Sequence, residues 1–189
     1  MVASKKNALR RGWLVFIDES GFCENGFIRR TWARRGITPV LRIKGRSWRR
    51  MSIIGAIAYR ADGSRCRLFM KLKRSTVRAE HFASFLDHLR RHLGSHFTVI
   101  WDRLHGHRGR VVRQWACRHP RCEITFLPAY APELNPVEAL WAWLKGTRLA
   151  NLSREDLSPL ANEVRQGARA ARRKHGLLQA FLRKSGLLL

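Results

Sequence analysis

Three acidic side chains stand where their carboxylates could do chemistry together. Asp18 follows the apolar run Trp13–Ile17, and Asp102 follows a second apolar run, Phe97–Trp101. Acids at the carboxyl ends of buried parallel strands meet at one edge of a sheet, where α/β proteins present their reactive groups. Glu138 lies in the first turn of a predicted helix. Three convergent carboxylates repel one another unless a cation lies between them, and hard oxygen ligands of this kind suit Mg²⁺ or Mn²⁺.

Two such ions, roughly 3.5–4 Å apart, can activate an attacking hydroxyl and stabilise the leaving oxygen of a phosphodiester. The sequence therefore predicts a site for two Mg²⁺ or Mn²⁺ ions made by Asp18, Asp102 and Glu138. Two plainer interpretations stay open at this point. Asp18 could begin an Asp-Glu-Ser-Gly turn, and Glu138 could complete a capping box by bonding back to the Asn135 N–H.

The stretch Leu127–Trp141 is predicted to hold Glu138 in place. Its three prolines bias the residues before them toward extended geometry, so the connection should be rigid. Asn135 suits an N-cap, and Pro136 suits the first helical position, where its missing N–H costs nothing. Apolar residues then recur at helical spacing and predict a face that packs on the sheet: Val137, Leu140, Trp141 and Leu144.

The predicted order of elements puts the first two acids side by side. After Trp13–Ile17, strands are predicted at Phe27–Val40 (a strand or hairpin), Ser52–Tyr59, Ser64–Leu72, Phe97–Trp101 and Glu123–Leu127. Helices are predicted at Arg78–Leu93, at Arg108–Arg118, from Pro136, at Ser158–Lys174 and at Leu177–Lys184. The early strands suggest an antiparallel meander. Because a helix lies in the crossover between the strands that carry Asp18 and Asp102, those strands should be adjacent and parallel.

The charge of the chain indicates a polyanionic partner. Lys and Arg total 38 against 13 acids, a net charge of +25, which points to nucleic acid. A hydrophobic content of 45%, with seven Trp and nine Phe, argues against a disordered basic tail. The stretch Arg29–Arg50 holds nine Lys/Arg, no acid, and the interleaved Trp32 and Trp48. The candidate DNA-binding residues are Arg29, Arg30, Arg34, Arg35, Arg46, Arg49 and Arg50, with a second stripe of Arg165, Arg169 and Arg173.

The cysteines and the hydropathy indicate the setting. Four cysteines form no Cys-x-x-Cys pair, and Cys117, His119 and Cys122 offer zinc-type ligands without an evident fourth, so ordinary reduced thiols are favoured. No signal peptide opens the chain, and no apolar run approaches membrane-spanning length. We expect a cytoplasmic, nucleoid-associated protein without a membrane partner.

These motifs resemble the DDE transposases of the mariner superfamily, in particular its bacterial insertion-sequence branch. The resemblance rests on Asp18-Glu19-Ser20-Gly21, on Asp102 with His107 five residues later, and on the stretch Leu127–Trp141. The 35 residues between Asp102 and Glu138 lie within the spacing typical of the family, and Thr31–Gly36 also looks like a family segment. The resemblance covers roughly residues 13–150.

The resemblance implies an RNase H-like fold, a mixed five-stranded sheet flanked by helices. Asp18, Asp102 and Glu138 would be the metal-binding catalytic triad, with Glu19, His107, Asn135 and Pro136 as supporting motif positions. Residues 13–150 would form the catalytic domain, preceded by a basic arm, 1–12, and followed by a basic helical extension, 151–189. The implied activity is strand cleavage and strand transfer at element ends. The partners would be the terminal inverted repeats, target DNA and a second copy on that DNA.

Two departures from the family pattern stand out. Many relatives have Asn after the second acid, where this chain has Arg103. Relatives also begin with helix-turn-helix modules, whereas here the first acid comes at position 18. We therefore expect either a separately encoded helix-turn-helix half or a truncated remnant. The alternatives are an RNase H-like nuclease and an inactive, basic DNA-binding remnant, and the intact triad favours an enzyme.

Overall fold

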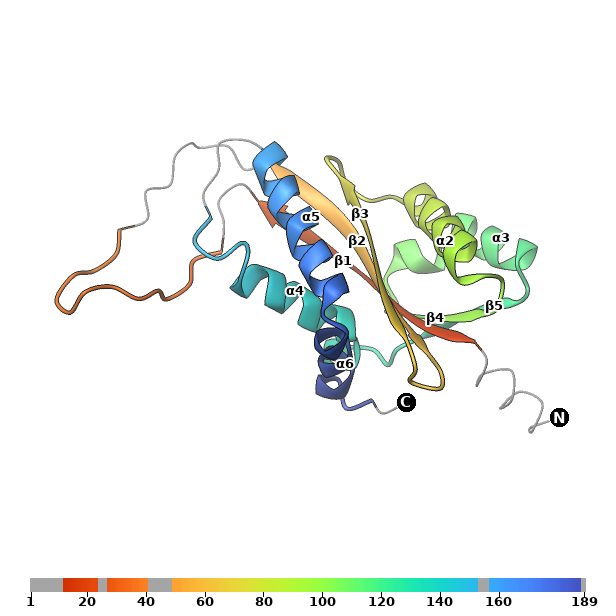
Figure 1. Ribbon diagram of the computed structural model, residues 1–189. Helices are drawn as coiled ribbons and strands as arrows, with labels where there is room; N and C mark the ends of the chain where they lie inside the picture. The colour runs from red at the N-terminus through yellow and green to blue at the C-terminus, as the bar shows by residue number, and fades with distance from the viewer. Residues whose placement is uncertain (1–11, 24–26, 41–48, 153–156, 188–189) are drawn as a thin grey trace.

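The protein is a five-stranded mixed sheet with helices on both faces (Figure 1). This computed structural model describes residues 12–23, 27–40, 49–152 and 157–187. In spatial order the strands are β3 (Cys66–Lys73), β2 (Arg50–Arg60), β1 (Trp13–Cys23), β4 (Phe97–Trp101) and β5 (Cys122–Phe126). The helices are α2 (Ala79–Leu93), α3 (Arg110–Arg118), α4 (Pro136–Gly146), α5 (Leu157–Arg173) and α6 (His175–Lys184), with short 3₁₀ turns η1 (His105–Arg108) and η2 (Pro132–Leu134). The predicted sheet, flanked by helices, is confirmed.

The predicted strand pairing is confirmed as well. Strands β1, β2 and β3 form an antiparallel meander, and the Ser64 N–H donates to Asp62 Oδ1 at 2.9 Å in the tight turn between β2 and β3. Gly63 has φ +71° there, a conformation that glycine adopts without strain. Strands β1 and β4 are parallel neighbours, paired from Trp13 opposite Phe97 onward. The crossover through α2 therefore places the two strands as the sequence indicated.

Strand β1 is longer than predicted. It continues to Cys23, so Asp18 lies inside the strand, opposite Gly55 of β2, and neither the predicted strand end at Ile17 nor the turn interpretation of Asp18 is correct. The reason is the ladder with β2, which pairs all eleven residues of β1 and overrides the local turn preference of Asp-Glu-Ser-Gly. Strand β4 pairs with β1 only as far as Phe16. Among the described residues, the second half of β1 thus has a strand on one side only.

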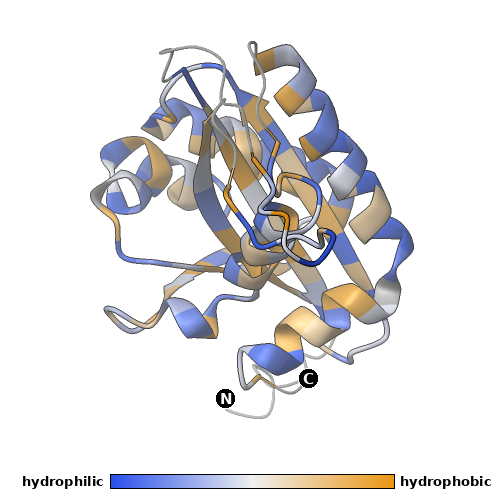
Figure 2. Cartoon of the chain, turned by 90° about the vertical axis from the view of Figure 1, so that its left-hand side faces the viewer, coloured by the Kyte–Doolittle hydropathy of each residue, from blue (hydrophilic) through white to orange (hydrophobic). Residues whose placement is uncertain are grey.

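Alternate side chains of the strands feed two hydrophobic layers. Trp13, Val15 and Ile17 of β1 pack on the side of α2 and α3, whereas Phe16 and Phe22 pack on the side of α4, α5 and α6. In Figure 2 the hydrophobic residues gather where helices and strands meet, and hydrophilic residues are frequent on the outer turns of the helices. Asp18 lies two residues after Phe16 in β1, so its side chain points to the same face of the sheet, toward the layer that contains α4.

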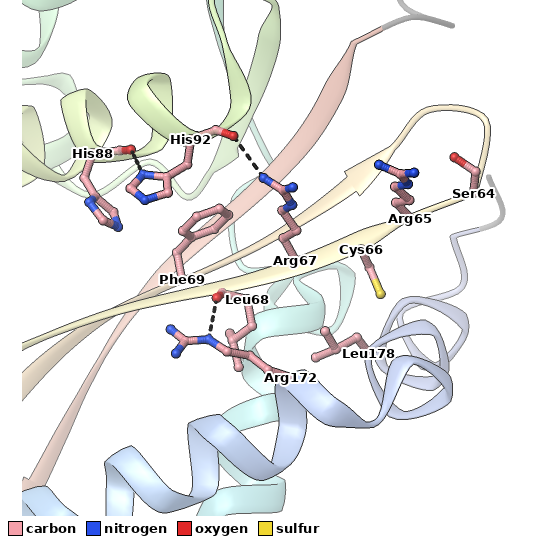
Figure 3. A pocket seen from close by; sticks show the side chains of 10 residues that line it. All are labelled: Ser64, Arg65, Cys66, Arg67, Leu68, Phe69, His88, His92, Arg172 and Leu178. Carbon is pink, nitrogen blue, oxygen red and sulfur yellow. Dashed lines mark hydrogen bonds between the residues drawn. The ribbon is translucent and has the colours of Figure 1, made fainter.

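Strand β3 forms one edge of the sheet, between the two helical layers. Arg172 of α5 donates its Nε–H to the backbone oxygen of Leu68 at 2.9 Å, and Arg67 reaches the other way, to the last turn of α2 (Figure 3). One arginine hydrogen bond thus ties β3 to each helical layer, and the bond from Arg172 occupies one of the backbone oxygens that an edge strand leaves unpaired.

The predicted strand or hairpin at Phe27–Val40 is wrong. Phe27 forms a single parallel bridge to Ala150, and residues 28–40 form an exposed loop that protrudes from the body of the protein (Figure 1). Its apolar residues lie in solvent, Trp32 being 100% exposed. Arginines and scattered apolar residues supply neither an alternating pattern nor a buried face to pair with. We call residues 27–40 the protruding segment.

None of the described helices combines the length and the apolar character needed to cross a bilayer. The predicted basic arm, 1–12, lies outside the described residues except for Gly12. Helices α5 and α6 pack on β3, β2 and α4. The domain boundaries at residues 12 and 150 stay predictions.

Candidate active site

Asp18, Asp102 and Glu138 line one cavity, of about 380 Å³. Asp18 lies on β1, Asp102 follows the last residue of β4, and Glu138 lies in the first turn of α4. The parallel register puts Phe16 opposite Ile100, so the two aspartates come at the same level, two residues further along each strand. The cavity thus lies where β1 has lost its β4 neighbour, and α4 closes it from one face of the sheet.

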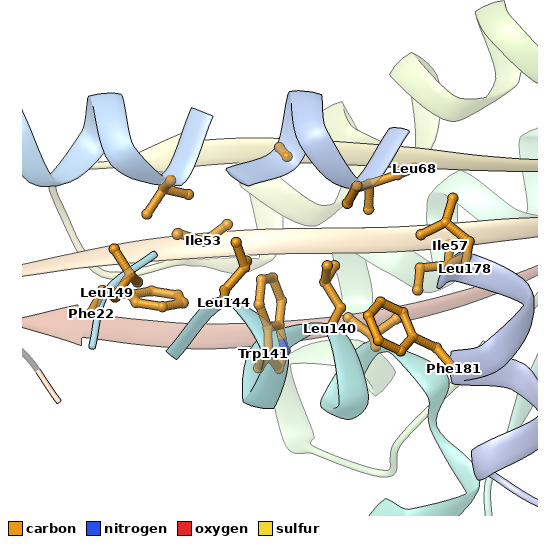
Figure 4. Packing of buried hydrophobic residues seen from close by; sticks show 14 of the residues in the cluster. Phe22, Ile53, Ile57, Leu68, Leu140, Trp141, Leu144, Leu149, Leu178 and Phe181 are labelled. Carbon is orange, nitrogen blue, oxygen red and sulfur yellow. The ribbon is translucent and has the colours of Figure 1, made fainter. Parts of the chain in front are cut away.

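Asp18 is held by a tryptophan from α4. Trp141 donates its Nε1–H to Asp18 Oδ2 at 2.7 Å, and both side chains are buried (Figure 4 shows the packing around Trp141). Gly55 makes room for the indole, because a Cβ atom there would lie 2.6 Å from Trp141 Cη2. Burial, then the negative charge of Glu138, raises the pKa of Asp18 to about 7, although the Trp141 bond opposes the shift.

Asn135 fixes the start of α4 against β1. Its Oδ1 accepts the Val137 N–H at 3.1 Å, which confirms the predicted N-cap, and its Nδ2 donates to the Ile17 backbone oxygen at 3.0 Å. Pro136 occupies the first helical position as predicted. The Asn135 N–H donates to the Pro132 oxygen at 2.9 Å, so it is not the partner of Glu138, and the capping-box interpretation is wrong. Glu138 is exposed and faces the cavity instead.

His107 joins the two aspartate-bearing strands on the opposite side. Its Nδ1 is hydrogen-bonded to Asp102 Oδ1, and its Nε2 lies 2.6 Å from Glu19 Oε1. The ring stacks on Trp101 at a centroid distance of 3.9 Å and meets the edge of Phe82. Burial opposes protonation of His107, but the hydrogen bond and charge of Glu19 and the charge of Asp102 outweigh it and raise its pKa. The imidazole is thereby fixed between two carboxylates.

The supporting positions Glu19, His107, Asn135 and Pro136 therefore surround the three acids. Sequence reasoning missed Trp141 as the donor to Asp18 and placed it only in an apolar face. A tryptophan in an otherwise aliphatic stripe was the available signal, because a buried indole N–H needs an acceptor. Gly55 carried no signal. Arg103, which stands where many relatives have Asn, lines the cavity and donates its Nε–H to the Leu127 oxygen at 3.1 Å.

The chemistry of the donor set fits a hard divalent cation. Asp18, Asp102 and Glu138 supply carboxylate oxygens, and none of them forms an ion pair with a described Lys or Arg. Burial, followed by the negative charge of Glu138, raises the pKa of Asp18 and disfavours its bare carboxylate. Within the described ranges no group of three or more His, Cys, Asp or Glu side chains already has metal-site spacing. The three acids line one cavity without forming such a group among the described residues.

The candidate DNA-binding arginines lie in two places. Arg29, Arg30, Arg34 and Arg35 are exposed on the protruding segment, Arg49 and Arg50 lead into β2, and Arg46 lies outside the described residues. Arg165, Arg169 and Arg173 are exposed on α5, whose buried face is Leu160, Val164, Ala168 and Ala171 as predicted. That these arginines contact DNA stays a prediction.

Solved structures share this fold. The Mos1 transposase paired-end complex with Mg superposes with a TM-score of 0.65 at 15% identity, over 98% of this chain and 57% of that chain. The Mos1 paired-end complex with the left transposon end gives 0.60 at 18% identity, over 98% and 58%. A simian T-cell lymphotropic virus intasome gives 0.58 at 14% identity, over 85% and 48%. The fold is therefore the RNase H-like fold of DDE enzymes, and this chain covers under three fifths of each of those two Mos1 chains.

The family assignment comes from the sequence itself. No significant match is found among curated proteins. The family model described as DDE superfamily endonuclease matches residues 13–160, which include all three acids and every strand of the sheet. The chain therefore belongs to the DDE superfamily of endonucleases.

Proposed function

We propose that this chain is the catalytic domain of a DDE transposase of the bacterial insertion-sequence branch. It would cleave DNA at the ends of an element and transfer the strands to target DNA, with two Mg²⁺ or Mn²⁺ ions held by Asp18, Asp102 and Glu138. One observation carries the proposal: the three carboxylates, on β1, directly after β4 and on α4, line one cavity, and none has a described Lys or Arg as ion-pair partner. The Mos1 structures with Mg, with Mn and with a transposon end support it.

Each aspartate has one oxygen that accepts a hydrogen bond from a side chain of the protein, and its other oxygen would face the cation. Asp18 Oδ2 accepts from Trp141, and Asp102 Oδ1 accepts from His107 and from the Leu104 N–H at 3.1 Å. Asp18 Oδ1, Asp102 Oδ2 and the Glu138 carboxylate would then be the ligands. Divalent cations bound there would activate the attacking oxygen and stabilise the leaving oxygen of a phosphodiester.

The surrounding residues orient these ligands. Trp141 holds the plane of the Asp18 carboxylate, and His107, held by Glu19, holds Asp102. Such outer partners keep ligands in a productive geometry. Arg103 has its Nε–H bound to a backbone oxygen at the rim of the cavity, so its other N–H groups can bind a phosphate oxygen of the DNA.

The test replaces one acid at a time. Asp18→Asn, Asp102→Asn and Glu138→Gln keep the shape but remove the charge that holds the ion. Each should lower Mg²⁺- or Mn²⁺-dependent nicking of end-bearing DNA by at least about a hundredfold, because loss of an outer-shell partner alone costs 10–100-fold. Nicking is measured with a helix-turn-helix recognition module supplied in trans. DNA binding should survive in all three variants.

Glu133→Gln is the matched control. Glu133 lies on η2 in the same motif, but it lines a neighbouring cavity beside α6 and not the one that contains Asp18. It should nick as the wild type does. If the Glu138→Gln protein nicks normally and the Glu133→Gln protein is inactive, Glu138 is not the third catalytic acid. A wild-type protein that binds ends but never nicks them would support the inactive remnant.

A further inference from the structure

A second, larger cavity lies at the edge strand β3, away from the three acids (Figure 3). We call it the β3 cleft. It has a volume of about 880 Å³, and its walls come from α2 on one face of the sheet and from α5 and α6 on the other. Its arginine and imidazole side chains are Arg65, Arg67, Arg172, His88 and His92. Among the described residues no Asp or Glu lines it.

Two of these arginines are fixed in place by backbone oxygens. Arg67 donates from Nη1 to the His92 oxygen at 3.0 Å, and Arg172 donates from Nε to the Leu68 oxygen at 2.9 Å. A carbonyl acceptor orients a guanidinium without neutralising its charge. The remaining N–H groups of each side chain are therefore held ready for an anion, with less conformational entropy to lose on binding.

Positive charge is crowded at the cleft. Burial, then the charge of Arg169, lowers the pKa of Arg172. The rings of His88 and His92 lie 4.3 Å apart, and burial, followed by the neighbouring cations, lowers the pKa of His88. Arg169 also belongs to the exposed stripe on α5, so the cleft continues into a wider basic surface. Like charges held together in this way are relieved by an anion between them.

An edge strand beside a cleft could also accept a peptide strand from a partner protein. The β3 edge is poorly suited to this, because the Leu68 oxygen is already occupied by Arg172. A peptide strand would also not neutralise the arginines. The lining favours repeated phosphates over a peptide backbone.

We propose that the β3 cleft binds the phosphodiester backbone of duplex DNA, as a contact separate from the carboxylate cavity. Arg67 and Arg172 would be the two phosphate ligands, one from each side of β3. The identification of the polyanion as DNA rests on the proposed function; the basic cleft itself does not.

The experiment measures affinity for a random duplex of about 30 base pairs by fluorescence anisotropy, in EDTA, over a series of salt concentrations. The test variant is Arg67→Gln/Arg172→Gln. Because each phosphate contact contributes about 0.9 to the slope of log affinity against log salt, the slope should become less negative by about 1.8. The affinity at about 0.1 M salt should fall roughly tenfold or more.

The control variant removes the same charge elsewhere. Arg113→Gln/Arg118→Gln lies on the exposed side of α3, and Arg118 is likewise anchored through Nε to a backbone oxygen, that of Gln114. Its slope should not change, and its affinity should fall less than about threefold. Equal losses from both double variants would mean that affinity follows net charge alone, and the proposal would be overturned.

A third variant separates loss of charge from a shift of β3. Arg67→Lys/Arg172→Lys keeps both positive charges, so it should recover the salt slope of the wild type. If the Lys pair loses as much as the Gln pair, phosphate charge is not what the cleft recognises, and the proposal fails. Thermal unfolding of each variant checks that the fold persists.

Inorganic phosphate distinguishes a small-anion site from a DNA site. Concentrations near 1 mM should leave the bound duplex in place, and displacement at that level would overturn the proposal. Because EDTA prevents cleavage, the binding test is independent of catalysis. If the wild type does not nick DNA but the Gln pair lowers DNA affinity as expected, only the proposed function is refuted. If the wild type nicks DNA but the Gln pair binds DNA as tightly as the wild type, only the proposal for the β3 cleft is refuted.

Discussion

Asp18 has the most demanding surroundings of the three acids. It is 8% exposed, it accepts a hydrogen bond from Trp141, and Glu138 faces the same cavity. Burial and the neighbouring charge disfavour its ionised form and raise its pKa to about 7 from an ordinary value of 3.8. A carboxylate in this position stores unfavourable electrostatic energy that a bound cation would release.

This surrounding makes the stability of the metal-free protein depend on pH. A carboxyl group with a raised pKa binds more protons folded than unfolded between about pH 4 and 7, so its contribution to stability falls as the pH rises through that range. The Asp18→Asn variant lacks this loss of stability, because its amide does not ionise. In EDTA its melting temperature should equal that of the wild type near pH 4 and exceed it above pH 7. The upper limit of that gain is on the order of 4 kcal/mol, or roughly 10 °C in melting temperature.

Thermal unfolding at several pH values checks this prediction. Glu133→Gln serves as control, because Glu133 lies outside the carboxylate cavity. A wild-type protein as stable as Asp18→Asn at pH 8 would mean that Asp18 is not strained in the folded protein. Excess Mg²⁺ should narrow the difference by stabilising the wild type alone.

At the scale of elements, helix α4 is the part that completes the cavity. Asn135 ties its first turn to β1, and Trp141, two turns along, lies across β2 at Gly55 and reaches Asp18. The register brings these contacts together, because Gly55 is paired with Asp18 itself. The position of Glu138 therefore depends on a glycine in a different element.

Gly55→Ala tests this dependence. Its Cβ would come within 2.6 Å of Trp141 Cη2 and 2.8 Å of Cζ2, in a buried layer where the ring cannot simply turn away. We expect a loss of about 1–3 kcal/mol, the usual cost of overpacking, and a shift of Trp141 from Asp18. The melting temperature and the rate of metal-dependent nicking should both fall.

Gly146→Ala is the control for that substitution. Gly146 ends the same helix and has nothing within 4 Å of its Cβ position, so alanine should be neutral or stabilise by up to about 1 kcal/mol. If Gly55→Ala has the same melting temperature as Gly146→Ala and the wild type, the Trp141 indole does not need the space that Gly55 provides.

At the scale of the whole molecule, charge separates into one acidic cavity and a widespread basic surface. The net charge is +25, yet the cavity of Asp18, Asp102 and Glu138 has no described Lys or Arg as ion-pair partner. Exposed arginines lie instead on the protruding segment, on α3 and on α5, and Arg103 lies at the rim of the cavity. This arrangement suits a protein that attracts a polyanion over a broad surface and a cation at one point.

Binding to DNA should therefore be tolerant of sequence and strongly dependent on salt. With six to ten phosphate contacts, affinity should fall about 10³–10⁵-fold between roughly 50 and 200 mM salt. Neutralising Arg165, Arg169 and Arg173 together should weaken binding to all sequences about equally. Anisotropy with two unrelated duplexes measures both effects. An affinity that hardly changes with salt would rule out the positive charge as the main determinant.

The sequence by itself determined the elements whose signals are local. An apolar run predicted β4 at Phe97–Trp101, and Asn135 with Pro136 predicted the start of α4, because caps and periodicity act over a few residues. The parallel pairing of β1 with β4 followed from the crossover rule. The three acids were found by residue type and spacing, and their catalytic role stays a prediction.

Only the tertiary structure decided how those acids are held. Trp141 and Asp18 are 123 residues apart in the chain, and His107 and Glu19 are 88 apart, so no local pattern contains either contact. The length of β1 likewise depended on its ladder with β2, and the irregular form of residues 28–40 on the lack of a strand to pair with. Strand pairing and side-chain contacts form between segments that folding brings together, and their free energy outweighs the local preferences that a sequence displays.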